Sequence, residues 1–171
     1  MLDLLNKTFP SMLTLLNVIF GSLAIIYSFH HDYKLAAIFI LCAVIMDSLD
    51  GKMARKLDST SEMGKELDSL CDLVSFGVAP AILIYSQVFY LQQNLYGLMV
   101  TIFFIVCGAL RLARFNVLNI PDHFLGVPIT LAGGLLALFS LFSLYSNQSL
   151  TLLVVLILSL LMISNIKTPK L

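Results

Sequence analysis

Four aspartates with helical spacing are the residues of this sequence best suited to chemistry. Asp47 and Asp50 are three positions apart, and Asp68 and Asp72 are four apart. Either spacing places both carboxylates of a pair on one face of a helix. They belong to the stretch 46–72, which holds seven of the ten acidic residues of the chain. Because like charges gathered at one place repel, we expect a counter-charge to bind there.

The donor atoms of this stretch indicate which counter-charge that is. Carboxylates are the ligands that Mg²⁺, Mn²⁺ and Ca²⁺ prefer, and a set without Cys or His disfavours zinc. Two divalent ions would balance four carboxylates, and paired metal sites favour phosphoryl chemistry. The alternative is a loop neutralised by salt bridges to Lys52, Arg55, Lys56 and Lys65. We favour the metal site, since the spacing within each acidic pair fits a helical face.

Small residues and one arginine stand among these aspartates. Gly51, Ala54 and Gly64 would let a bulky polar ligand approach the helix backbone closely. By themselves, such residues are equally typical of close helix packing. Arg55 can bind a phosphate group through two parallel hydrogen bonds.

The amino-acid composition indicates that these aspartates are carried by membrane helices. Of the 171 residues, 59% are apolar and only 12% are charged, whereas ordinary soluble domains carry about 25% charged residues. Apolar runs long enough to cross about 30 Å of hydrocarbon recur along the chain. We therefore predict an all-α integral membrane protein that forms a single domain over residues 1–171, with no nucleic-acid partner.

Six transmembrane helices are expected, after a short N-terminal segment over residues 1–10 at the membrane interface. The expected spans are 12–29, 33–53, 67–90, 95–117, 126–145 and 149–166. Nine of the ten basic residues then fall on one side, and only Lys34 falls on the other. This bias places both termini and the acidic stretch on the cytoplasmic side of the cell membrane. The N-terminus does not read as a cleavable signal, because Asp3 and Pro10 interrupt the required pattern.

The acidic stretch as a whole resembles the signature of the CDP-alcohol phosphatidyltransferases. It reads D-x2-D-G-x2-A-R-x8-G-x3-D-x3-D, with every specified residue in place. The resemblance implies an enzyme that displaces CMP from a CDP-linked lipid with an alcohol. It implies that two divalent ions, Mg²⁺ or Mn²⁺, bind Asp47, Asp50, Asp68 and Asp72. It also implies that Asp72 is the general base. The CDP group is implied to lie on Gly51, Ala54, Arg55 and Gly64.

Three further stretches resemble the phosphatidylserine synthase branch of that family. They are SFGVAP at 75–80, ALRLARFN at 109–116 and FLGVP at 124–128. This resemblance implies CDP-diacylglycerol as donor, L-serine as acceptor, phosphatidylserine as product and a homodimer in the lipid bilayer. The stretch TLLN also fits, although Ser11 follows Pro10 where the family often has asparagine. Thr14 and Asn17, which share one helical face, are therefore the expected CDP contacts from the first span.

Arg111 and Arg114 are candidates for binding the acceptor. They are three positions apart near the end of the fourth expected span, and arginine binds a carboxylate through two hydrogen bonds. The alternative is ordinary anchoring at the level of the lipid headgroups. A phosphorylated acceptor, such as glycerol phosphate or inositol phosphate, would also favour arginine. The choice of serine therefore depends on the resemblance.

Other classes of protein and other residues give weaker hypotheses. A membrane cation transporter would also carry acidic residues, but typically near mid-membrane and repeated between two halves. A scaffold that only binds nucleotide-lipids would not require a spare base. Cys42, Cys71 and Cys107 have no metal-binding spacing and are expected to be buried apolar residues. Gly133 and Gly134 are typical of close helix packing.

Overall fold

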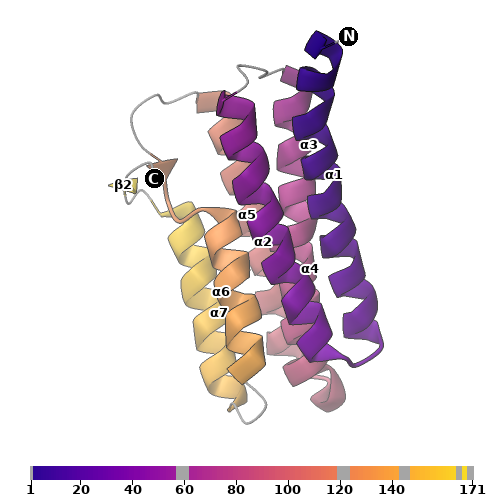
Figure 1. Ribbon diagram of the computed structural model, residues 1–171. Coiled ribbons are helices and arrows are strands. Elements are labelled where there is room, and N and C mark those ends of the chain that lie inside the picture. The colour runs from indigo at the N-terminus through magenta and orange to yellow at the C-terminus, as the bar shows by residue number, and fades with distance from the viewer. Residues whose placement is uncertain (1, 57–61, 119–123, 143–146, 165–166, 169–171) are drawn as a thin grey trace.

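The protein is a bundle of long helices that run up and down side by side (Figure 1). The computed structural model describes residues 2–56, 62–118, 124–142, 147–164 and 167–168. The five helices that form one uninterrupted element each are α1 (Leu2–Phe29), α2 (Tyr33–Lys56), α5 (Leu95–Leu118), α6 (Ile129–Phe142) and α7 (Gln148–Ile163). Two short strands, β1 (Phe124–Leu125) and β2 (Lys167–Thr168), pair antiparallel.

The rod between α2 and α5 is built from five consecutive pieces. They are α3 (Glu62–Asp72), η1 (Leu73–Val78), α4 (Ala79–Ile84), η2 (Tyr85–Phe89) and η3 (Tyr90–Gln92). Both η1 and η2 are π-helical, a wider turn that occurs mostly as single insertions and frequently at functional sites. The first π-helical piece begins directly after Asp72, so the last aspartate of the acidic stretch lies at a change of helical pitch.

The η1 piece lies at the centre of the bundle, in contact with α1, α5 and α6. Around it, α1 packs along α2, α2 packs on α6, and α5 packs on α7. The largest fully buried side chains include Phe76, Phe89 and Phe104. Most large apolar side chains on the outer faces of the helices are exposed, as expected for a bundle surrounded by lipid rather than water.

Glycines allow two helices to approach η1 closely. A Cβ atom added at Gly133 of α6 would lie 2.5 Å from the carbonyl oxygen of Phe76 and 2.8 Å from its Cα. A Cβ at Gly21 of α1 would lie 2.7 Å from the Cα of Ser75. At Gly134 the nearest atom would be a flexible methyl of Val44, at 3.4 Å. The predicted packing role of the Gly133–Gly134 pair is confirmed, with Gly133 the more constrained position.

The FLGVP stretch connects the start of α6 to the end of α7. Gly126 has a positive φ of 78° and lies against the backbone of Met162, so both its conformation and its surroundings favour glycine. The N–H of Val127 donates to the carbonyl of Leu161 at 3.1 Å. Helix α6 begins only at Ile129, three residues later than expected, because this segment is bonded to α7 instead.

Polar side chains pair with one another at the end of the bundle opposite the acidic stretch. The hydroxyl of Ser140 donates to Oε1 of Gln87 at 2.6 Å, and Nε2 of Gln87 donates to the carbonyl of Ser140 at 3.1 Å. Nδ2 of Asn94 donates to Oε1 of Gln148 at 3.2 Å. These bonds connect η2 and the start of α5 to α6 and α7. Hydrogen bonds of this kind hold membrane helices together where water does not compete.

The lengths and composition of the helices support a helical membrane protein. Three helical stretches of the described chain are long and apolar enough to span a bilayer: Met12–Phe29, Glu62–Phe89 and Leu95–Val117. The apolar helices α6 and α7 are shorter, and α2 carries the charges of the acidic stretch. The count of six spans and the orientation in the membrane stay predictions. Residues 2–10 do not form a separate element, since α1 runs without a break from Leu2.

The cysteines follow the sequence expectation in part. Cys71 and Cys107 are buried, and Cys42 is half-buried. All three are free thiols, and none joins the group of acidic oxygens described below.

Candidate active site

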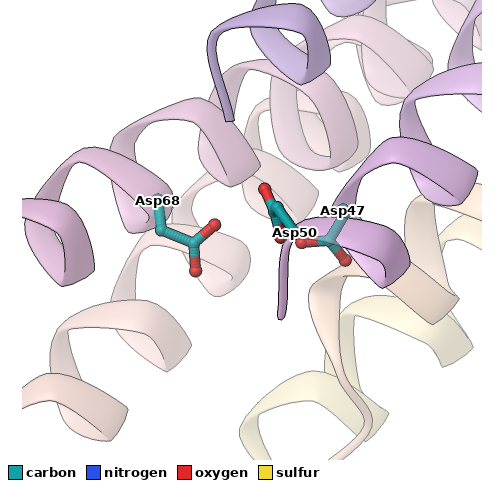
Figure 2. Close-up of side chains that lie close together, drawn as sticks. All are labelled: Asp47, Asp50 and Asp68. Atoms are coloured by element: carbon teal, nitrogen blue, oxygen red, sulfur yellow. The ribbon is translucent and has the colours of Figure 1, made fainter. Parts of the chain in front are cut away.

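Three of the four predicted aspartates meet between α2 and α3. One carboxylate oxygen from each of Asp47, Asp50 and Asp68 lies within 4.8 Å of the other two. Figure 2 shows the three side chains facing a common space from the two helices. Asp50 is only 5% exposed, and the other two are half-buried. The predicted helical faces therefore bring carboxylates from both sides of the connection into one place.

Asp72 lies beside this acidic trio rather than within it. Its side chain is buried, with 8% exposed, and its Oδ1 accepts a hydrogen bond from Nδ2 of Asn17 at 3.2 Å. Its carboxyl also lies within hydrogen-bonding reach of Asp47. The structure thus separates one aspartate from the other three, a difference that the spacing of the motif does not indicate.

Hydroxyl groups from two other helices bond to the trio. Thr14 of α1 bonds to Asp50, and Thr130 of α6 bonds to Asp47. Sequence reasoning selected Thr14 as a CDP contact and missed Thr130. The only signal for Thr130 was its position two residues after the FLGVP stretch. Both threonines orient carboxylates, so the site draws on four elements of the bundle.

Several polar atoms of the site are buried without a hydrogen-bond partner among the described residues. They are one oxygen each of Asp50 and Asp68, Oδ1 of Asn17 and Nε of Arg111. Buried polar atoms in folded proteins are nearly always paired, so the unpaired atoms of the charged residues Asp50, Asp68 and Arg111 indicate a ligand. Clustered carboxylate oxygens with unused lone pairs fit a hard divalent cation.

The small residues of the motif lie next to this cluster. A Cβ atom at Gly51 would meet no atom within 4 Å, so the backbone beside Asp50 faces open space that a polar ligand can enter. Gly64 is half-buried in the first turn of α3. The side chains of Ala54 and Arg55 lie outside the described residues, and their predicted contacts to CDP stay predictions.

The two candidate arginines differ in their surroundings. Arg111 is half-buried, and its charge interacts with that of Asp72. Arg114, almost one turn later, is exposed. Arg111 is thus the more buried of the two and interacts with Asp72, although their spacing alone would give both the same surroundings.

Asn116 holds the end of α5 against α3. Its Nδ2 donates to Oγ of Ser69 at 3.1 Å and to Oε2 of Glu66 at 3.3 Å. These bonds fix α5 next to the helix that carries Asp68 and Asp72. The contribution of Asn116 was not predicted, although it closes the ALRLARFN stretch.

Comparisons with known proteins agree with this geometry. The family described as CDP-alcohol phosphatidyltransferase matches residues 7–164. A relative from Bacillus subtilis (strain 168) is 42% identical over 133 residues, which cover 77% of this chain and 74% of the relative. A relative from Methanocaldococcus jannaschii is 42% identical over 163 residues, covering 95% of this chain and 74% of the relative. Both relatives carry the name CDP-diacylglycerol–serine O-phosphatidyltransferase.

A third relative of the same name comes from Helicobacter pylori (strain J99) and is longer. It is 38% identical over 135 residues, which cover 76% of this chain but 56% of that protein. The similarity to all three relatives extends over at least three quarters of the chain, so it is not confined to the motif.

Proposed function

Because the chain belongs to the CDP-alcohol phosphatidyltransferase family, we propose that it transfers the phosphatidyl group of CDP-diacylglycerol to L-serine. The products are phosphatidylserine and CMP. The observation that carries this proposal is the meeting of Asp47, Asp50 and Asp68 across two helices. The names of the relatives from Bacillus and Methanocaldococcus support serine as the acceptor.

The acidic trio, together with Asp72, is proposed to hold one or two divalent cations, Mg²⁺ or Mn²⁺. The unpaired carboxylate oxygens of Asp50 and Asp68 support this assignment. When bound, the ions supply positive charge beside the diphosphate, which stabilises the negative charge that develops on the CMP leaving group.

Asp72 is proposed to act as the general base. The serine hydroxyl oxygen attacks the phosphorus that bears the diacylglycerol group, and the bond from that phosphorus to the CMP oxygen breaks. The hydroxyl proton passes to the carboxylate of Asp72, which must lie within hydrogen-bond reach of it. Its position beside the trio supports this role, since a carboxylate less engaged by metal is better able to accept a proton.

The nucleotide end of the donor is proposed to lie over the start of the acidic stretch. Gly51 and Gly64, which have no side chain, and Ala54, which has a small one, are proposed to let the nucleotide approach the helix backbone. Arg55 binds a phosphate of the diphosphate through two hydrogen bonds. Thr14, which bonds to Asp50, lies at the buried side of this nucleotide site. The open space at Gly51 supports this placement.

Arg111 is proposed to bind the carboxylate of serine. Its half-buried guanidinium has an Nε atom without a hydrogen-bond partner among the described residues. Its nearness to Asp72 would place a bound serine with its hydroxyl close to the base. Arg114 contributes from a more exposed position.

The setting in the membrane is also proposed. The chain spans the cell membrane six times, with both termini and the site on the cytoplasmic side. It forms a homodimer through helices away from the acidic site, so that each protomer keeps its own site. Native mass spectrometry in mild detergent checks the dimer, and only monomers at working concentration would contradict it.

Release of CMP by the purified protein tests the function. The protein in detergent micelles with CDP-diacylglycerol and Mg²⁺ should release CMP when serine is added. Parallel reactions contain glycerol phosphate, inositol phosphate or ethanolamine. Release of CMP with glycerol phosphate or inositol phosphate, but not with serine, would identify that alcohol as the acceptor. Release of CMP with no alcohol present would overturn the proposal.

A further inference from the structure

We propose that Asn17 is a positioning residue for Asp72, holding its carboxylate in the orientation that accepts the serine proton. This inference depends on the proposed function for the role of Asp72. It assigns to Asn17 an action through another side chain, in place of a direct contact with CDP.

The geometry that carries the inference is a buried bond between two distant parts of the chain. Asn17 is fully buried on α1, and its Nδ2 donates to Oδ1 of Asp72 at 3.2 Å. A side chain with no exposed surface is poorly placed to bind a nucleotide that enters from outside the bundle. It is well placed to fix the rotation of a neighbouring carboxylate.

The backbone at Asn17 is fixed by a second bond to the same rod. The hydroxyl of Ser75 in η1 donates to the carbonyl oxygen of Asn17 at 3.0 Å. Gly21, one turn further along α1, permits this contact, because a Cβ there would overlap the backbone of Ser75. Asn17 is therefore bonded on both sides of the junction at which α3 becomes π-helical. Asp72 is the last residue before that junction.

The charge distribution explains why Asp72 needs such a support. The carboxylates of Asp47 and Asp68 both act on Asp72 electrostatically, and like charges in a poorly solvated site push a side chain away. A neutral amide donor holds Oδ1 in place without cancelling the negative charge of the base. Hydrogen-bond partners that orient the side chains of metal sites typically contribute about 10–100-fold to metal affinity or activity, and we expect a factor of this size here.

Two substitutions of Asn17 test the proposal. Asn17→Ala removes the amide, and Asn17→Leu removes it while keeping a similar volume in the buried site. Both should lower kcat for serine-dependent CMP release about 10–100-fold. The KM values for CDP-diacylglycerol and serine should change by less than about threefold, because neither substrate loses a contact. Ser28→Ala is the matched control on α1. Among the described residues, its buried hydroxyl bonds to the carbonyl of Ala24 in the same helix, and kcat should stay at the parent value.

A second measurement does not depend on activity. A structure of Asn17→Leu should show the Asp72 side chain in a changed or multiple rotamer, with α1 and η1 unmoved. An unchanged Asp72 rotamer would overturn the inference. So would a raised KM for CDP-diacylglycerol with kcat preserved, which would make Asn17 a nucleotide contact. A parent protein that releases CMP with no alcohol would instead overturn the proposed function, and the rotamer would still decide the role of Asn17.

Discussion

The guanidinium of Arg111 on α5 interacts with the carboxyl of Asp72 at the end of α3. The two residues are 39 positions apart in the sequence, and Asn116, five residues beyond Arg111, bonds the two helices together. A serine molecule between them would have a cation for its carboxylate on one side and a proton acceptor for its hydroxyl on the other. This electrostatic interaction therefore relates acceptor binding to the chemical step.

The substitution Arg111→Ala should raise the KM for serine with little effect on the KM for CDP-diacylglycerol. Losing one partner of a buried, hydrogen-bonded charge pair costs about 2–5 kcal/mol, which corresponds to roughly 30-fold or more in affinity. Arg114→Ala is the matched comparison. It should change the serine KM by only about fivefold or less, since exposed charge pairs contribute about 0–1 kcal/mol. Steady-state kinetics with each substrate varied in turn provides both values.

Equal effects of the two arginine substitutions on the serine KM would contradict this difference in role. A loss of CDP-diacylglycerol affinity in Arg111→Ala, with serine affinity unchanged, would assign Arg111 to the lipid diphosphate. Ethanolamine lacks the carboxylate that Arg111 is proposed to bind. It should be a poor acceptor for the parent protein and should be little affected by Arg111→Ala.

Removal of divalent metal should abolish CMP release. Excess EDTA should eliminate activity, and Mg²⁺ or Mn²⁺ should restore it, because the site offers only hard oxygen ligands. Asp47→Ala, Asp50→Ala and Asp68→Ala should each weaken Mn²⁺ binding, measured by electron paramagnetic resonance, along with activity. Asp32→Asn is the control, since Asp32 is exposed and outside the acidic trio. Full turnover in EDTA would exclude the metal-dependent mechanism.

The substitution Asp72→Asn should separate metal binding from chemistry. The amide keeps the size of the side chain but cannot accept the serine proton, and general-base catalysis typically contributes about 10²–10⁴-fold. We expect kcat to fall by that factor while Mn²⁺ binding stays within about tenfold of the parent. If Mn²⁺ binding is lost as completely as in Asp50→Ala, Asp72 is primarily a metal ligand and the base lies elsewhere.

The neighbouring glycines of α6 should differ sharply in their tolerance of alanine. Gly133→Ala places a methyl group against the backbone of Phe76, which cannot move without displacing η1. Overpacking of this kind costs about 1–3 kcal/mol. Gly134→Ala meets only a methyl of Val44 at 3.4 Å and should leave stability near the parent value. Thermal unfolding in detergent, followed by circular dichroism, compares the two variants, and equal melting temperatures would contradict the proposed packing.

The sequence was most informative where function depends on local spacing. The intervals between Asp47 and Asp50, and between Asp68 and Asp72, determine shared helical faces, and a short connection makes the two helices neighbours. These features predicted that Asp47, Asp50 and Asp68 meet. The apolar runs likewise predicted most helix positions. Helix ends differ by a few residues, as before α6, where Val127 bonds to Leu161 of α7 instead of continuing the helix.

What the sequence did not reveal depends on contacts between distant elements. Thr130 and Asn116 contribute through partners on other helices, and no local pattern distinguishes them from other polar residues of membrane helices. The different environments of Arg111 and Arg114 depend on how α5 is rotated against its neighbours. No amino-acid composition distinguishes the π-helical turns after Asp72 from α-helical turns. These turns determine which residues of the SFGVAP stretch face α1.

The paired polar side chains at the far end of the bundle have a consequence for its motions. Ser140 and Gln87 bond to each other twice, and Nδ2 of Asn94 donates to Oε1 of Gln148. The acidic end instead gathers mutually repelling groups. Local opening is least costly where such stabilising contacts are fewest. Amide hydrogens should therefore exchange fastest at the end of α2 and the start of α3, and slowest around η2. Thermal fluctuations would then be concentrated at the acidic end, where the headgroups of substrate and product are proposed to bind. The opposite end of the bundle would stay rigid.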